Sequence, residues 1–190
     1  FQPVFLRMLH NDKNVLERLN QDWEQENDDP KFDLFRRKLE TEFLKEDINP
    51  SGKLVLFSES VDTLTYLQER LTQELGRNDV LMVTASNRNR LGQVIKENFD
   101  ANYPNDSRRY NLIITSDVLA EGVNLHRSNV IVNYDSPWNA TRLMQRIGRV
   151  NRIGSVAPNI YNYMFYPSQQ GDKEIRLYKN ALVKLQGFHS

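Results

Sequence analysis

The sequence predicts an α/β fold, in which a parallel β-sheet carries helices on both faces and follows a helical appendage. From about residue 53 onward, short apolar runs alternate with segments whose apolar residues recur at helical spacing. The apolar runs are continuous, as expected of strands that helices cover on both faces. In such sheets the functional loops follow the carboxyl ends of the strands, so polar motifs at those positions are candidate sites.

Five apolar runs are the predicted strands, at residues 53–58, 80–84, 112–115, 130–134 and 160–166. A helix follows the first of them, with Gly76 as its predicted end. Three further helices are predicted after the second, fourth and fifth strands. The helix after the first strand is defined by Leu64, Leu67, Leu71 and Leu75, and the helix after the second strand by Leu91, Val94, Ile95 and Phe99. The helix after the fifth strand is defined by Ile175, Tyr178, Leu182 and Leu185.

Residues 1–50 differ in character and form the predicted appendage or linker, ahead of a domain at residues 51–190. Helical spacing of apolar residues predicts a helix over residues 31–46, after an acidic, polar linker at residues 21–29. An Asn-Pro-Ser-Gly sequence then breaks the chain before the first strand. Residues 102–109, rich in Asn, Asp, Ser and Arg, are predicted to be a disordered loop.

The composition excludes several classes of protein. The 190 residues include no cysteine and only three scattered histidines, which excludes a disulfide framework and a local metal motif. No apolar run approaches the ~20 residues of a membrane span, and no signal peptide is visible. We therefore expect a cytoplasmic protein with no membrane partner. Because the sequence begins at Phe1, we also expect it to be a piece of a longer protein, monomeric by itself.

The charge is balanced overall but unevenly distributed. A formal net charge of zero argues against a strongly basic nucleic-acid-binding domain. However, residues 17–50 carry eleven acids against six bases, whereas residues 140–154 carry four arginines and no acid. The arginine segment is therefore the place where this chain is most suited to meet a polyanion.

The arginine segment is a predicted amphipathic helix. At ~100° per residue, Leu143, Ile147 and Val150 share one face. Gln145, Arg149 and Arg152 share the opposite face, and planar guanidinium groups held there suit phosphate oxygens. The spacing alone fits a helix with a solvated basic face equally well.

Four further stretches follow predicted strands. Thr115 and Ser116 end the third strand and precede Gly122, a residue type that lets backbone approach a phosphate or sugar closely. Ser58 ends the first strand, where it either contacts a phosphate or, like Ser60, caps the next helix. Two arginines after the second strand, Arg88 and Arg90, fit either phosphate contacts or a solvated helix start. Before the arginine helix, residues 133–139 read N-Y-D-S-P-W-N, with Asn139 as the predicted N-cap and Trp138 as a predicted buried anchor.

The pattern Q-x-x-G-R-x-x-R, formed by Gln145, Gly148, Arg149 and Arg152, is similar to motif VI of superfamily-two helicases and translocases. The resemblance implies a RecA-like lobe. It also implies that Arg149 and Arg152 act as arginine fingers, which stabilise charge on the transferring γ-phosphate of ATP, with Gln145 as a neighbouring polar contact.

Residues 112–125 resemble motif V of the same superfamily, and residues 54–58 resemble motif IV. By these resemblances Ser58, Thr115 and Ser116 contact the nucleic-acid backbone, and Arg88 and Arg90 add sequence-independent phosphate contacts. Gly122 and Asn124 approach the ATP ribose and the opposing lobe. Asn124 stands where many members of the superfamily have an acid.

The Y-D-x-P-W-N connector resembles the Swi/Snf-type branch, especially its bacterial members. No Walker lysine loop and no D-E-x-H box occur in the sequence, so the resemblance implies the second motor lobe of an ATP-driven nucleic-acid translocase or helicase, with double-stranded DNA as the expected substrate. Its expected partner is an N-terminal RecA-like lobe of the same protein, which would supply most of the ligands of Mg²⁺. The alternatives are a strand-separating or restriction helicase, a non-hydrolysing interaction module and a free-standing phosphotransferase.

Overall fold

The computed structural model describes residues 2–25, 28–119, 122–137 and 139–166. The chain divides into two compact units, Phe1–Arg37 and Lys38–Ser190. The predicted appendage of residues 1–50 therefore extends over the first unit and into the second. The final helix predicted around residues 175–185 lies outside the described residues.

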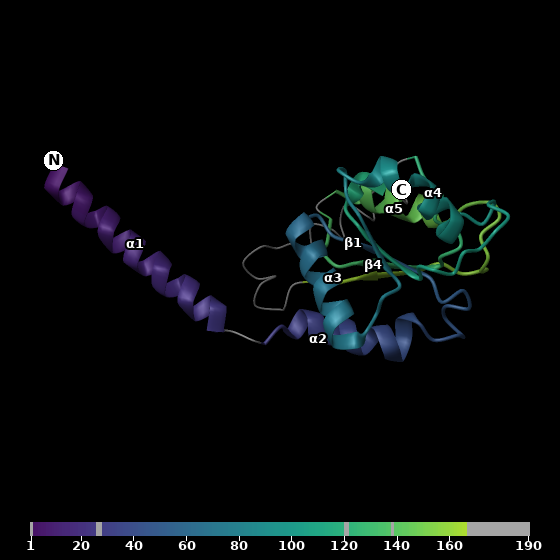
Figure 1. Cartoon of the computed structure of the whole chain (residues 1–190), viewed down its shortest axis with the longest axis horizontal. Helices are drawn as coiled ribbons and strands as arrows, with labels where there is room; N and C mark the ends of the chain where they lie inside the picture. Colours follow the sequence, from purple (N-terminus) through teal and green to yellow (C-terminus); the bar gives the residue numbers. More distant parts are fainter. Residues whose placement is uncertain (1, 26–27, 120–121, 138, 167–190) are drawn as a thin grey trace, which may run out of the picture. The chain divides into compact units, whose positions relative to one another are not determined.

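A five-stranded parallel sheet forms the centre of the second unit, which confirms the predicted α/β fold (Figure 1). Its strands are β1 (Leu54–Phe57), β2 (Val80–Val83), β3 (Leu112–Thr115), β4 (Val130–Asn133) and β5 (Tyr161–Met164). They lie in the order β2-β3-β1-β4-β5, and all four neighbouring pairs are parallel. Leu54 aligns with Leu112 and with Val130, so the carboxyl ends of the three central strands are level.

Helices cover both faces of this sheet. Figure 1 shows α4 (Arg88–Phe99) and α5 (Ala140–Val150) on one face and α3 (Val61–Leu75) on the other. Strand residues of one parity, such as Val55 and Ile113, share a buried cluster with Ile95 of α4 and Val150 of α5. On the other face, α3 buries Leu64, Leu67 and Leu71. Burial on both faces explains why the strands read as continuous apolar runs.

The two ends of α3 follow from specific residues. Ser60 caps the amino end, since its hydroxyl oxygen accepts a hydrogen bond from the amide of Thr63 at 3.3 Å. Gly76 follows the carboxyl end with φ +60°, a left-handed conformation that favours glycine. Both the predicted stop at Gly76 and the alternative assignment of Ser60 as the cap are confirmed.

Two glycine substitutions in the second unit should change stability in opposite directions. Gly76→Ala should lower the free energy of unfolding by about 1–2 kcal/mol, because alanine is disfavoured in the left-handed region. Gly92→Ala, inside α4, should raise it by about 0.5–1 kcal/mol through helix propensity. An added Cβ at either position meets no atom within 4 Å, so sterics do not confound the comparison, which urea unfolding would measure. A shift of the same sign in both variants would contradict the conformational argument.

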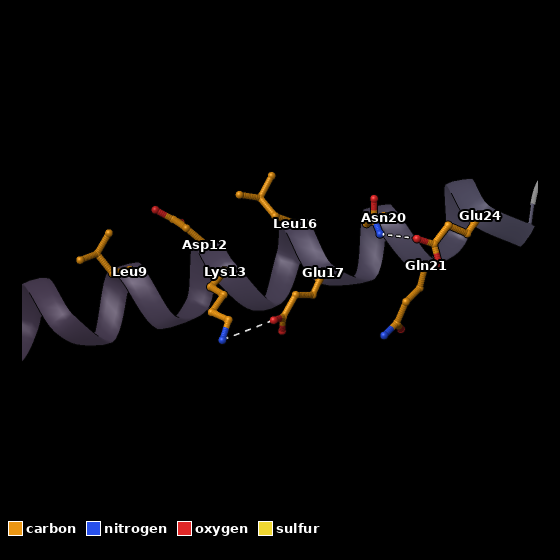
Figure 2. Close-up of a pocket in the computed structure, with 8 residues that line it drawn as sticks. All are labelled: Leu9, Asp12, Lys13, Leu16, Glu17, Asn20, Gln21 and Glu24. Atoms are coloured by element: carbon orange, nitrogen blue, oxygen red, sulfur yellow. Dashed lines mark hydrogen bonds and ion pairs between the residues drawn. The ribbon is translucent and has the colours of Figure 1, made fainter. Parts of the chain in front are cut away.

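The amino-terminal segment differs from its prediction in two ways. Helix α1 (Gln2–Gln25) runs through residues 21–25, which were predicted to be a linker. Gln21, Glu24 and Gln25 are good helix formers, and the side-chain amide of Asn20 donates to Glu24 one turn later at 2.8 Å. Figure 2 shows this pair and the Lys13–Glu17 ion pair beside a shallow hollow that is lined by α1 alone.

The second difference concerns the predicted helix over residues 31–46. Helix α2 (Pro30–Lys38) is followed by one π-helical turn, η1 (Leu39–Phe43), instead of continuing. The wider turn accompanies the burial of both Leu39 and Phe43, and the Phe43 ring lies 4.5 Å from that of Tyr163 on β5. Among the described helices, none is long and apolar enough to cross a membrane.

The prediction of a disordered loop at residues 102–109 was wrong. Arg127 is buried beneath this loop and donates to the carbonyl oxygens of Tyr103 and Asn105. The amide of Ser107 also donates to the carbonyl of Glu97 at 3.1 Å. The loop sequence is polar and gives no local sign of this order, because the arginine that holds the loop lies about 20 residues further along the chain.

Candidate functional site

The predicted motifs meet at the carboxyl edge of the sheet. Thr115 at the end of β3 and Asn133 at the end of β4 both align with Phe57 at the end of β1. The residues that follow these strands therefore emerge side by side. Helix α5 packs near this edge and contacts the 3-10 turn η2 (Asp117–Leu119), which comes directly after β3.

Helix α5 begins where it was predicted to begin. The side chain of Asn139 accepts a hydrogen bond from the amide of Thr141 at 2.9 Å, which confirms Asn139 as the N-cap. The helix ends at Val150, so Arg152 lies in the turn beyond it. Trp138, the predicted buried anchor, lies outside the described residues.

Arg146 does not follow the predicted division of α5 into an apolar face and a basic face. It is fully buried, together with the apolar residues Leu143 and Val150, so one of the four arginines belongs to the core side of α5. Its Nε donates to Asp117 at 2.6 Å and its Nη1 donates to Asn133 at 2.9 Å. The guanidinium carbon also lies 5.0 Å from the centre of the Phe57 ring. Arg146 therefore ties α5 to the ends of three strands.

Arg146 was not among the predicted site residues. Its position, three residues after Leu143 and four before Val150, is the signal that places it on the buried side. Arg142, one turn earlier, is half exposed and donates to the same Asp117 at 3.2 Å. Asp117 thus joins two arginines of α5 to the motif V turn.

Arg152 and Asn124 are brought together as a pair. Arg152 donates from Nη1 to the side-chain oxygen of Asn124 and from Nε to the carbonyl of Gly148 at 3.2 Å. The side-chain amide of Asn124 in turn donates to Asp100 at 3.1 Å. Asp100 fixes the orientation of the Asn124 amide, and Asn124 then fixes the position of the Arg152 guanidinium.

A buried histidine lies behind this pair. Nδ1 of His126 lies 3.7 Å from a carboxylate oxygen of Asp100. Burial lowers the pKa of His126, and this effect outweighs the opposing attraction of Asp100. The imidazole is therefore neutral near pH 7, and it adds no positive charge beside Arg152.

Arg149 and Gln145 occupy the half-buried side of α5. They lie four residues apart, so their side chains project from the same side of the helix. The carbonyl of Arg149 accepts a hydrogen bond from the amide of Leu125 at 2.9 Å, which joins α5 to the segment after the motif V turn. The structure thus connects Arg149, Arg152 and Asn124 through one short stretch of backbone and side chains.

Two of the predicted nucleic-acid contacts do not agree with the structure. Ser58 is fully buried, and its hydroxyl donates to Asp135. Thr115 is also fully buried, and its hydroxyl donates to the carbonyl of Val83 at 2.9 Å. Both side chains stabilise the ends of strands, so a phosphate contact from either hydroxyl is no longer assigned.

The remaining predicted contacts stay accessible. Ser116 is half buried at the strand edge, Arg90 is exposed and Arg88 is half buried at the start of α4. Gly122 has φ +78°, and an added Cβ there would lie 2.7 Å from Nη2 of Arg88. Arg88 and Gly122, predicted to contact different ligands, are therefore neighbours, and a side chain at position 122 would require the end of the Arg88 side chain to move.

The accessible groups at this edge are mainly guanidinium groups, amides and a hydroxyl. Such donors suit phosphate oxygens, because charge-assisted hydrogen bonds from arginine can be bidentate. Within the described ranges, no group of three or more His, Asp or Glu side chains is arranged to hold a metal ion.

Comparisons with known proteins identify the family of this domain. The family model for the helicase conserved C-terminal domain matches residues 31–154. The uncharacterized ATP-dependent helicase YqhH of Bacillus subtilis is 46% identical over 52 residues, which are 27% of this chain and 9% of that protein. The ATP-dependent RNA helicase cgh-1 of Caenorhabditis elegans is 30% identical over 127 residues, covering 66% of this chain and 27% of that protein. The chain therefore spans a small part of either relative.

Two solved structures share the fold. The C-terminal part of the Fun30 ATPase domain matches with a TM-score of 0.61 and 19% identity, covering 90% of this chain and 52% of that chain. Dbp5 of S. cerevisiae, bound to RNA and ADP BeF3, matches with a TM-score of 0.53 and 21% identity, covering 80% of this chain and 36% of that chain.

Proposed function

Since this chain belongs to the helicase conserved C-terminal domain family, we propose that it is the second motor lobe of an ATP-dependent nucleic-acid translocase or helicase. One observation carries the proposal. Arg152 is held beside the carboxyl edge of the sheet by Asn124, and Arg149 lies one turn away on α5. Two arginines placed in this way fit the role of arginine fingers toward ATP bound between two lobes.

The residues divide the chemistry between this lobe and its partner. Arg149 and Arg152 would stabilise the charge on the γ-phosphate, with Gln145 as a polar neighbour and with Gly122 and Asn124 near the ribose. The lysine loop and most ligands of Mg²⁺ would come from an N-terminal RecA-like lobe of the same protein. Mg²⁺ would there neutralise phosphate charge. Closure of the lobes around ATP, and their release after hydrolysis, would move the protein along its track.

Ser116, Arg88 and Arg90 are the proposed nucleic-acid contacts. They would touch phosphates and not bases, so binding should be independent of sequence and sensitive to salt. The Y-D-x-P-W-N connector supports double-stranded DNA as the track. RNA is the second candidate, because a relative that aligns with two thirds of the chain is named an RNA helicase. ATPase stimulation of the full-length protein by duplex DNA against single-stranded RNA would distinguish the two.

The 190-residue chain alone should show negligible ATPase activity and at most weak binding of nucleic acid. It supplies the arginines but no Walker lysine loop, and phosphoryl transfer needs both. A steady-state phosphate-release assay on the purified chain, with the full-length protein as the positive control, measures this. Turnover by the chain at the rate of the full-length protein, abolished by Arg149→Ala, would contradict the proposal.

A further inference from the structure

A polar pocket of about 300 Å³ lies at the amino edge of the sheet, opposite the edge that carries the proposed motor residues. Lys53 directly precedes β1 and Asn111 directly precedes β3, which places the pocket at the start of these two strands. Its lining residues are Pro50, Ser51, Lys53, Asp106, Arg108, Asn111, Arg127 and Val156. None of them belongs to the proposed motor site.

Three cations in the pocket share one carboxylate. Asp106 lies 3.4 Å from Nζ of Lys53, 3.5 Å from Nη1 of Arg127 and 3.7 Å from Nε of Arg108. The lining therefore carries three positive charges against one negative charge, a formal excess of two. A cleft lined by charge of one sign concentrates ions of the opposite sign.

Two of these cations are fixed in place. Lys53 is only 2% exposed and donates to the carbonyl of Tyr110 at 3.1 Å. Arg127 is 8% exposed and donates to the carbonyl of Glu97 at 2.7 Å. Burial lowers the pKa of Lys53; Asp106 opposes this effect, whereas Arg127 and Arg108 add to it. A second anion in the pocket would therefore relieve an existing repulsion among the cations.

The third cation is held differently. Arg108 is the one non-glycine residue with positive φ, +49°, in the described part of the chain. Its amide donates to Asp106 at 3.2 Å, which stabilises this unusual turn, while its side chain is 85% exposed. Residues held in sparsely populated backbone regions concentrate at binding sites. The turn places a guanidinium at the mouth of the pocket, from where it can move onto a ligand.

We propose that this pocket binds a phosphate group. Lys53 and Arg127 form the fixed base, and Arg108 closes over the ligand. A phosphate monoester carries about 1.5–2 negative charges at neutral pH, comparable to the formal excess, and its oxygens accept charge-assisted hydrogen bonds from guanidinium and ammonium groups. Asp106 pairs with all three cations and therefore competes with the ligand for them.

Titration of the 190-residue chain with inorganic phosphate at constant ionic strength tests the proposal, with backbone amide NMR shifts of residues 105–111 as the readout. Arg108→Gln should weaken binding by ~10-fold or more, because it removes a charge-assisted pair from the ligand. Arg109→Gln is the matched control: the neighbouring guanidinium stacks 5.1 Å from the Tyr110 ring and does not line the pocket. It should change the affinity by less than ~2-fold.

Asp106→Asn should tighten phosphate binding, because it removes the competing carboxylate. Short DNA with a 5′-phosphate, compared with the same DNA bearing a 5′-hydroxyl, identifies the source of the phosphate. An Arg108-dependent preference for the phosphorylated end over free phosphate assigns the pocket to a nucleic-acid end, and equal affinities assign it to a free ion. Equal losses in Arg108→Gln and Arg109→Gln, no saturable shifts, or Arg108-dependent binding of an acidic peptide without phosphate binding would each overturn the proposal.

Discussion

Arg149→Ala in the full-length protein should lower ATP turnover by ~10³-fold or more and leave nucleotide binding comparatively intact, following arginine-finger magnitudes. The reason is that an arginine finger stabilises charge that develops on the γ-phosphate in the transition state, and such an interaction contributes little to the ground state. Arg152→Ala should have an effect of similar size. Steady-state turnover and nucleotide affinity, measured on the same preparations, separate the two quantities.

Arg142→Ala is the matched control for this experiment. Arg142 lies on the same helix, and its replacement by alanine removes the same charge. Its side chain is 52% exposed and forms ion pairs with Glu59 and Asp117. It should retain most of the turnover, because exposed ion pairs contribute little. Equal losses from Arg142→Ala and Arg149→Ala would show that general charge on α5 matters and not the finger position. Unchanged turnover in Arg149→Ala and Arg152→Ala would refute the assignment itself.

The elements that the sequence predicted well are those with local causes. The apolar runs became β1 to β5 with shifts of at most two residues at their ends. The three central strands β1, β3 and β4 are buried at every position, which is why they are apolar nearly throughout. Gly76 and Asn139 were placed correctly, since a left-handed C-cap and an N-cap each depend on one residue type.

The failures involve partners that lie far away in the chain. Ser58 donates to Asp135, 77 residues later, and no local pattern reveals that its hydroxyl is already engaged. The order of the loop at residues 102–109 was missed for the same reason, because the loop is held by Arg127, which lies about 20 residues further along the chain. The burial of Arg146 was not predicted, because arginine is rarely buried unless it has partners. Its partners, Asp117 and Asn133, come from η2 and β4 and not from the same helix.

Arg146→Ala should lower the free energy of unfolding of the 190-residue chain by about 3 kcal/mol, the lower end of the range for breaking a buried ion pair. The substitution leaves Asn133, which is fully buried, without the donor at its side-chain oxygen, and it removes the packing on Phe57. Asp117 is 26% exposed and regains water, which is why the upper end of that range is not expected. Urea unfolding at neutral pH measures the change, and Arg142→Ala should cost about 0–1 kcal/mol.

Arg146→Met separates the ion pair from the packing. Within the described residues, Nη2 of Arg146 is buried without a hydrogen-bond partner, so the native network already carries an unsatisfied group. An apolar side chain of similar length keeps the contact with Phe57 and removes that group, so Arg146→Met should be less destabilising than Arg146→Ala. Arg146→Lys keeps the charge but cannot reach Asp117 and Asn133 together, because an ammonium lacks the planar fork. If Arg146→Ala costs no more than Arg142→Ala, the buried network contributes nothing measurable to stability, and the prediction is refuted.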